Sequence, residues 1–218
     1  MTIELFAHPF SSYSQKVLIA LRENEIDFTF RMLGPDTPGQ QELAEIWPLA
    51  RFPVLREGER VVPEATIIIE YLQVHHRGPV VLIPEKPDAA VEVRMLDRFL
   101  DNYILNPQMS IVFNAIRDPK DRDPVGDDRA RATLDTAYRW LDDWMEGKAW
   151  AVGEAFSLAD CAAAPALFYA DWTHEIGSEF SRVRAYRSRL LDRESFARAV
   201  DEARPYRDLF PLGAPDRD

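Results

Sequence analysis

Hydrophobic and polar positions in the first part of the chain follow two different periods. Thr2–Ala7 and Phe28–Leu33 alternate residue by residue, which predicts two β-strands. Between them, Tyr13–Asn24 carries Val17 and Leu21 on one face of a predicted helix. A strand, a helix and a second strand within about thirty residues are typical of a parallel βαβ unit with a right-handed crossover.

The pattern continues with a second helix, a hairpin and a third helix. Gln40–Trp47 is predicted to be a short helix that follows a break rich in proline and glycine. Pro53–Arg56 and Arg60–Val62 flank a Glu-Gly pair and predict a β-hairpin. Ala65–His76 contains three consecutive isoleucines that would suit a buried strand, but its length favours a helix.

The segment Arg77–Asp88 has the composition of a connector, with three prolines and one glycine. No strand pattern recurs after it. We therefore expect an α/β domain at residues 1–78, a linker at 79–88 and an all-helical domain at 89–218.

Helical periodicity alone characterises the second part of the chain. Ala89–Arg117 predicts a long helix that Pro107 should kink, because proline removes a backbone donor and clashes with the preceding turn. Apolar residues in Asp127–Glu146 recur at 4-3-4-3 spacing, which predicts an amphipathic helix packed along its neighbour. Further helices are predicted at about 158–172, 179–192 and 194–203.

The composition of the 218 residues is that of a folded globular protein, with 46% apolar and 29% charged residues. Acidic residues outnumber basic ones 37 to 26, and the net charge of −11 disfavours nucleic acid or an anionic membrane as a partner. A small molecule or a protein is favoured instead. The N-terminal residues lack the pattern of a secretion signal, and no apolar run suits a transmembrane helix, so we expect a cytoplasmic protein.

Residues with metal-binding or nucleophilic side chains are few. Cys161 is the single cysteine, so no intramolecular disulfide can form, and its alanine neighbours predict a small buried residue. His8, His75, His76 and His174 do not have the spacing of metal ligands. We therefore expect no metal.

Three local segments carry candidate chemistry, and the first is the turn after the opening strand. It places the hydroxyl groups of Ser11, Ser12 and Tyr13 at the start of a helix. Unpaired backbone N–H groups and the positive end of the helix dipole favour an anion there, such as a thiolate. In the alternative interpretation a serine only caps the helix and Tyr13 belongs to the core.

The second segment is Arg51–Leu55, in which Pro53 opens a short apolar strand. A trans proline would only mark the first residue of that strand. A cis bond between Phe52 and Pro53 would instead turn the backbone N–H and C=O groups of Phe52 outward, where a peptide ligand can pair with them.

The third segment is Pro63–Thr66, at the head of the isoleucine-rich helix. The Glu64 carboxylate can hold a ligand ammonium group while the Ala65 N–H meets a ligand carboxylate. Both ends of an amino acid would then be bound. In the alternative interpretation Glu64 only complements the helix dipole.

In this order and spacing, the three segments resemble the cytosolic glutathione S-transferase family, bacterial type with a serine active site, over nearly the whole chain. SSYSQKVLIALRENEIDFTF is similar to the active-site helix of the family, PLARFPVL to its cis-proline loop and PEATIIIEYL to its γ-glutamyl loop. FSLAD resembles its capping box, in which Ser157 and Asp160 exchange bonds through side chains and backbone N–H groups. The resemblance implies an α/β thioredoxin-like N-terminal domain, an all-α C-terminal domain and a homodimer.

The resemblance also implies roles for individual residues. The catalytic hydroxyl would be that of Ser11, with Tyr13 and then Ser12 as the next choices. Glutathione, the implied cosubstrate, would be bound by Gln40 or Gln41, Arg51, Phe52, Pro53, Glu64 and Ala65. A small hydrophobic electrophile would lie against Phe10, Tyr103, Asn106, Met109, Phe113 and Trp172.

The implied activity is conjugation of glutathione, activated as a thiolate, to a small apolar electrophile. Isomerisation, dehalogenation and peroxide reduction need the same thiolate and remain open alternatives. Ala65 stands where the family usually has serine, and the missing hydroxyl favours weaker glutathione binding. This departure keeps a second interpretation open, a non-catalytic regulatory or scaffold protein of the same fold.

Overall fold

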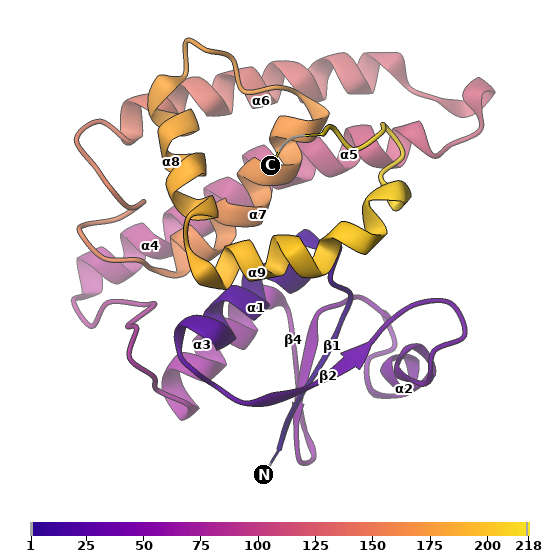
Figure 1. The fold of residues 1–218 in the computed structure, drawn as a ribbon, viewed down its shortest axis with the longest axis vertical. Coiled ribbons are helices and arrows are strands. Elements are labelled where there is room, and N and C mark those ends of the chain that lie inside the picture. The colour runs from indigo at the N-terminus through magenta and orange to yellow at the C-terminus, as the bar shows by residue number, and fades with distance from the viewer. Residues whose placement is uncertain (1, 217) are drawn as a thin grey trace.

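A computed structural model of the chain, which describes residues 2–216 and 218, contains an α/β half and a helical half (Figure 1). Each predicted strand and helix of the first half is present. In chain order this half contains β1 (Ile3–Ala7), α1 (Ser12–Glu23), β2 (Phe28–Met32), α2 (Pro38–Ile46), β3 (Val54–Glu57), β4 (Arg60–Pro63) and α3 (Ala65–His75).

The four strands form one mixed sheet in the order β2-β1-β3-β4. β1 and β2 are parallel, as the βαβ pattern predicted, and β3 and β4 form the antiparallel hairpin. Ile3 and Leu5 of β1 belong to a core cluster with residues of α1 and α3. Phe6, on the opposite face of the sheet, packs instead with Leu43 of α2. The sheet is therefore covered on both faces.

The second half is helical throughout, which confirms the predicted combination of a thioredoxin-like α/β part and an all-α part. It contains α4 (Pro87–Phe99), the π-helical segment η1 (Leu100–Leu105), α5 (Asn106–Ala115), η2 (Pro119–Asp121), α6 (Pro124–Trp144), α7 (Leu158–Thr173), α8 (Ser181–Leu191), α9 (Glu194–Ala203) and η3 (Arg204–Leu209).

The helix changes type just before Pro107. The sequence predicted a kink at this proline but did not reveal the π-helical segment. The helix continues through η1, where the Asn106 N–H donates to the Asp101 carbonyl, five residues earlier. Proline has no N–H for the usual bond to the fourth preceding residue, and the wider π-helical turn lies just before it.

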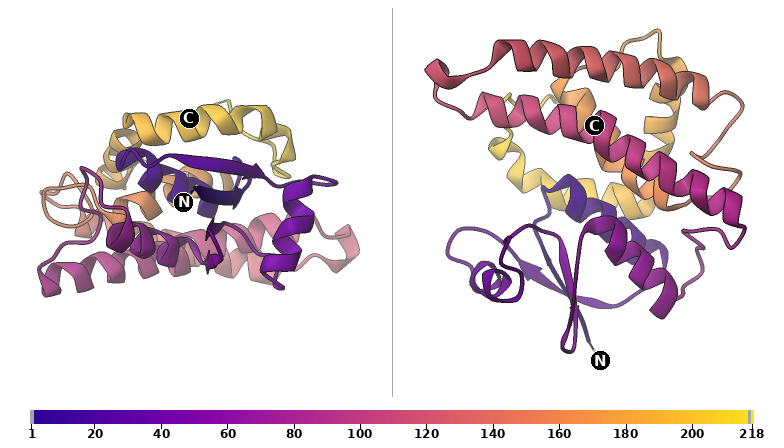
Figure 2. Two further views of the ribbon diagram at one scale, coloured as in Figure 1. Left: turned by 90° about the horizontal axis from the view of Figure 1, so that it is seen from below. Right: turned by 180° about the vertical axis from the view of Figure 1, so that it is seen from behind.

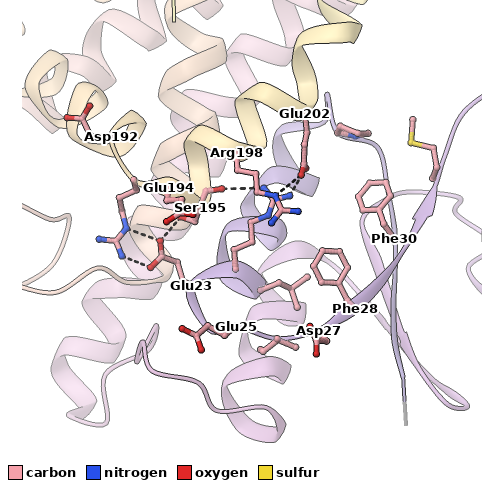
Figure 3. A pocket seen from close by; sticks show the side chains of 16 residues that line it. Glu23, Glu25, Asp27, Phe28, Phe30, Asp192, Glu194, Ser195, Arg198 and Glu202 are labelled. Carbon is pink, nitrogen blue, oxygen red and sulfur yellow. Dashed lines mark hydrogen bonds and ion pairs between the residues drawn. The ribbon is translucent and has the colours of Figure 1, made fainter.

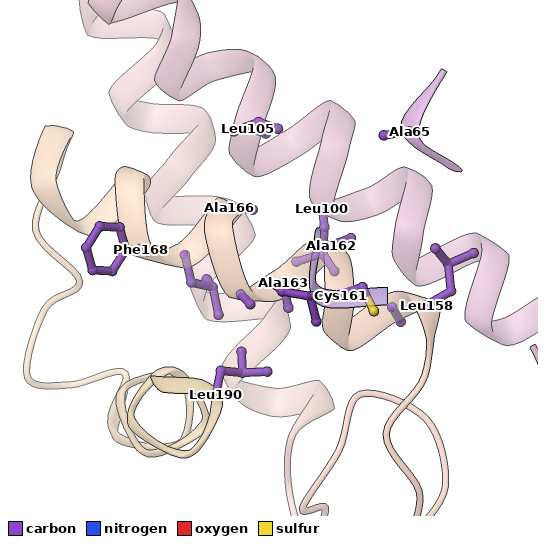
Figure 4. Close-up of a cluster of buried hydrophobic side chains, with 14 of the residues drawn as sticks. Ala65, Leu100, Leu105, Leu158, Cys161, Ala162, Ala163, Ala166, Phe168 and Leu190 are labelled. Carbon is purple, nitrogen blue, oxygen red and sulfur yellow. The ribbon is translucent and has the colours of Figure 1, made fainter. Parts of the chain in front are cut away.

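Helix α7 forms the centre of the helical half and is buried along its whole length (Figure 4). Alanines at 162, 163, 164 and 166 let neighbouring helices approach closely. Its predicted capping box is present, since Asp160 Oδ2 accepts from the Ser157 N–H at 2.8 Å. The adjacent Cys161 is buried, and burial raises the pKa of its thiol well above the ordinary value.

Helix α1 lies between the two halves and packs against α3, α7 and α9 (Figures 1 and 2). Its Lys16 is 1% exposed, and its ammonium group lies 2.5 Å from Asp97 and 3.1 Å from Asp101. Thr66 of α3 accepts a further bond from Lys16 at 3.0 Å. A buried charge that is paired across three elements fixes their relative positions, because loss of one partner leaves the other uncompensated.

Among the described residues, no helix combines the length and apolar character needed to cross a bilayer.

Candidate active site between the two halves

A cleft of about 790 Å³ lies between the α/β half and the helical half. It brings together most of the residues that the sequence singled out, although these lie far apart along the chain. Those that line it are Phe10, Ser11, Ser12, Tyr13, Arg51, Phe52, Pro53, Glu64, Ala65, Met109 and Phe113.

The first turn of α1 presents several free donors to this cleft. Ser11 is the N-cap, and its Oγ accepts a bond from the Ser14 N–H at 3.3 Å. A hydroxyl oxygen that accepts a cap bond still has its proton to donate. Within the described part of the chain, neither the Ser11 hydroxyl proton nor the N–H groups of Ser12 and Tyr13 have an acceptor. The capping role and the anion-binding role of Ser11 are therefore compatible.

Tyr13 adds a phenol that stays neutral. Burial, together with the negative charge of Asp101, raises the pKa of Tyr13 to about 12. The phenol is consequently protonated at neutral pH and can donate a hydrogen bond, but it cannot accept a proton as a base. Burial also raises the pKa of Asp101, which lines the same cleft.

Helix α3 points its amino end into the cleft as well. Its N-cap is Glu64, whose exposed carboxylate makes no capping bond and has no partner among the described residues. Glu64 has φ 72°, and Ala50, also at the cleft, has φ 49°. Positive φ costs a non-glycine residue about 1–3 kcal/mol and is concentrated at functional sites. Two helix ends thus direct unpaired N–H groups at one space, which favours an anionic ligand.

The loop before β3 supplies a cation and a cis peptide bond. Of the two alternatives for Phe52–Pro53, the structure shows the cis form. Arg51 is exposed and makes no ion pair with any residue that the structure describes. Its guanidinium is therefore available to a ligand carboxylate.

The helical half contributes the apolar side of the cleft. Met109, Val112 and Phe113 of α5 line it, together with Phe10. The Phe10 ring packs edge-on against Tyr169, with ring centroids 5.5 Å apart. An apolar lobe beside a set of hydrogen-bond donors suits a ligand that has both an apolar part and a polar part.

Five predicted site residues lie outside the lining of the cleft. Trp172 packs behind it, 6.5 Å from the Phe10 ring. Tyr103 is exposed and its ring packs at a tilt against Phe99, and Asn106 is exposed at the start of α5. Gln40 and Gln41 lie in the first turn of α2, away from the lining residues.

Other lining residues were not anticipated from the sequence. Tyr169 lies one turn before Trp172 on α7, and its hydroxyl accepts from Gln15 at 2.9 Å. Periodicity identified the helix but not which aromatic faces the cleft. Leu209, Phe210 and Pro211 also line the cleft, and their only signal was a short apolar run in a charged tail.

Metal ligands are not grouped in this cleft or elsewhere in the described residues, where no three His, Cys, Asp or Glu side chains form a possible metal site.

Residues 5–80 match the family model described as glutathione S-transferase, N-terminal domain. Residues 105–194 match the model described as glutathione S-transferase, C-terminal domain.

Full-length relatives carry different names. A stringent starvation protein A homolog of Haemophilus ducreyi is 24% identical over 93% of this chain and 92% of its own length. A probable maleylacetoacetate isomerase of Caenorhabditis elegans is 25% identical over 92% of this chain and 94% of its own.

Among solved structures, a glutathione S-transferase from Methylobacillus flagellatus with glutathione bound superposes with a TM-score of 0.80 at 25% identity. The superposition covers 91% of this chain and 98% of that one. Two family models that together span most of the chain, and a fold match over its length, lead to one conclusion: the chain belongs to the glutathione S-transferase family.

Proposed function

We propose that the chain is a glutathione S-transferase that binds glutathione in the interdomain cleft and conjugates its sulfur to a small apolar electrophile. The observation that carries the proposal is the convergence of two helix amino ends on one cleft with an apolar lobe. Glutathione carries two carboxylates, an ammonium group and a thiol, which match the unpaired groups on the polar side.

The sulfur is assigned to the start of α1. There the Ser11 hydroxyl would donate to the thiolate, and the free N–H groups of Ser12 and Tyr13 would add a favourable field. Lowering the pKa of a thiol from about 8.5 to about 6.5 requires roughly 2.7 kcal/mol. One hydrogen bond to a charged acceptor contributes about 1.5–3 kcal/mol, so Ser11 and the helix dipole can supply that difference.

The two ends of the tripeptide are assigned to the other segments. The γ-glutamyl end would lie at Glu64 and the Ala65 N–H, and the cysteinyl backbone at Phe52 and Pro53. Arg51 would bind the glycine carboxylate, and Gln40 and Gln41 would need to approach from α2 to assist it. In the reaction the thiol would give its proton to solvent, and a sulfur electron pair would form the new bond to the electrophilic carbon. In a substitution that carbon loses its leaving group with the bonding electron pair. In an addition the π electrons move to the far end of the double bond, which takes a proton from solvent.

A calorimetric titration with glutathione, followed by turnover assays across electrophile classes, tests this proposal. Binding with turnover supports a transferase. Turnover only with a substrate that is isomerised, dehalogenated or reduced would move the activity to one of those reactions. Failure to bind glutathione at millimolar concentration would contradict the proposal.

A specific observation also favours a second candidate, a non-catalytic regulator of the same fold. Ala65 provides a backbone donor but no hydroxyl at the γ-glutamyl position. The Haemophilus ducreyi relative, named as a stringent starvation protein A homolog, is matched over almost its whole length. Glutathione binding with no turnover in any electrophile class is the result that this candidate predicts.

We also propose a homodimer formed through α3 and α4. The two helices are joined by the ion pair between Arg94 and Glu70, at 2.8 Å. Beside it, Ile67 and Val91 are 51% and 65% exposed, which leaves apolar surface for a second copy. Light scattering coupled to gel filtration should give twice the chain mass, and the double substitution Ile67→Glu/Val91→Glu should give the monomer.

A further inference from the structure

A second hollow, larger than the cleft, lies beside the outermost strand of the sheet (Figure 3). Its volume is about 1220 Å³, and its walls are β2, the carboxyl end of α1 and one side of α9 from Glu194 to Glu202. We call it the β2–α9 groove. It shares no lining residue with the cleft.

The floor of the groove is an apolar stripe on β2. Phe28, Phe30 and Met32 are opposite Ile3, Leu5 and Ala7 of β1 in register, so all six side chains lie on the same face of the sheet. The β1 side chains are buried, whereas Phe28, Phe30 and Met32 are only half-buried. The stripe therefore extends the core face of the sheet into the groove.

The backbone of β2 is open at this place. β2 is the end strand of the sheet and pairs only with β1. The Leu33 N–H donates to the Ala7 carbonyl at 3.0 Å. Because successive residues direct their peptide groups to opposite sides, Arg31 also faces β1, and Phe28 and Phe30 face the free edge. Their N–H and C=O groups are available to an added strand.

The rim of the groove is acidic and unpaired. Four carboxylates are exposed and have no hydrogen-bond or ion-pair partner among the described residues, namely those of Glu25, Asp27, Asp192 and Glu194. The guanidinium groups of the groove are all engaged. Arg22 and Arg198 pair with Glu202, and Arg193 pairs with Glu23. The uncompensated charge at the rim is negative.

Partly buried contacts join α1 to the start of α9. Glu23 of α1 accepts from both Arg193 and Ser195 at the start of α9, and Arg22 donates to the Ser195 carbonyl at 3.3 Å. The groove is thus formed before a ligand arrives, which reduces the ordering cost of binding.

We propose that the β2–α9 groove binds an extended, basic segment of a partner protein, which adds to the free edge of β2. Apolar side chains of the segment lie on the Phe28–Met32 stripe, and its lysines or arginines meet the unpaired carboxylates. A second copy of this chain is a poor occupant, because its net charge of −11 opposes an acidic rim. Helix α9, which forms one wall of the groove, lies on the opposite side of the molecule from α4 (Figure 2). The proposed dimer through α3 and α4 therefore leaves the groove accessible.

The probe for this proposal is a fluorescent seven-residue peptide in which lysine alternates with valine and phenylalanine, titrated with the full chain. The variant Glu25→Lys/Asp27→Lys should weaken binding about tenfold, because it replaces attraction by repulsion at two rim positions. The control Asp121→Lys/Asp128→Lys makes the same change of charge at exposed, unpaired positions in η2 and the first turns of α6, which do not line the groove, and should weaken binding less than about twofold. Equal losses in the two variants, or no binding to the unaltered chain, would overturn the proposal.

Hydrogen exchange locates the peptide on the strand. With peptide bound, the amides of Phe28 and Phe30 should exchange more slowly, while that of Arg31, already directed at β1, should not change. Saturating glutathione should leave peptide affinity unaltered. Unprotected Phe28 and Phe30 amides, or displacement by glutathione, would contradict binding at this edge.

Discussion

The cleft and the β2–α9 groove differ in which polar groups they leave unpaired. The cleft presents mainly donors, the hydroxyl of Ser11, backbone N–H groups and the free guanidinium of Arg51, beside the unpaired carboxylate of Glu64. The groove presents acceptors, four carboxylates whose neighbouring arginines are already paired. The larger hollow is therefore not the one suited to glutathione, because volume alone says nothing about the charge of a ligand.

One helix connects the two hollows. α1 begins in the cleft at Ser12 and ends at Glu23 in the wall of the groove. The amino end of a helix carries partial positive charge and the carboxyl end partial negative charge. The same helix thus favours an anion at one end and a cation at the other. Substitutions at the two ends should affect different ligands, and the following predictions test that separation.

The largest effect is expected at Ser11. Ser11→Ala should lower conjugation up to about 25-fold at neutral pH, because a thiol with a pKa of about 6.5 is roughly three-quarters ionised there, whereas one with a pKa of about 8.5 is only about 3% ionised. Ser11→Thr, which keeps both the cap and the donor, should retain most of the rate. Steady-state kinetics measure both, with Ser12→Ala as the control. A loss confined to Ser12→Ala would move the catalytic role by one residue.

The next effect is expected at Arg51. Arg51→Ala should weaken glutathione binding about tenfold, since a charged hydrogen bond to the glycine carboxylate is worth about 1.5 kcal/mol or more. Arg198→Ala removes an arginine from the groove and should leave the calorimetric dissociation constant unchanged. If both substitutions weaken binding equally, the effect is that of overall charge.

A smaller effect, a gain in glutathione affinity, is expected from a substitution at Ala65. Ala65→Ser supplies a hydroxyl beside the free N–H at the start of α3, and a net hydrogen bond of about 0.5–1.5 kcal/mol would tighten glutathione binding about two- to tenfold. Ala155→Ser, at an exposed loop, is the matched control. Unchanged affinity in Ala65→Ser would place the γ-glutamyl group elsewhere.

The smallest effect concerns the titration of Tyr13. With its pKa raised to about 12, the phenol remains protonated as pH rises from 5 to about 10, so it contributes no step to the pH–rate profile in that range. Tyr13→Phe should therefore leave the midpoint of the profile in place, even if it lowers the plateau. A midpoint that moves in Tyr13→Phe would make Tyr13 the group that sets the thiol pKa.

Local signals explain why so much of the fold was predictable. Periodicity identifies α1 and α6, and the Glu-Gly pair marks the turn between β3 and β4, because these features depend on neighbours in sequence. The cleft residues at the starts of α1 and α3 were found for the same reason. Each lies at a helix end, where sequence and chemistry coincide.

Tertiary packing decides the features that were missed. Whether Tyr169 or Trp172 faces the cleft depends on how α7 is rotated against α1, which its mostly apolar sequence does not reveal. The approach of Leu209–Pro211 to the cleft depends on where α9 ends in space. The π-helical form of η1 depends on how the helix accommodates Pro107 within the packed bundle.

The most direct test of the central claim is the pKa of the thiol of bound glutathione, followed through the ultraviolet absorbance of the thiolate as pH is raised. The unaltered protein and Ser12→Ala should titrate well below the free value of about 8.5, and Ser11→Ala should titrate close to it. The same low pKa in Ser11→Ala would contradict a thiolate stabilised by the Ser11 hydroxyl at the amino end of α1.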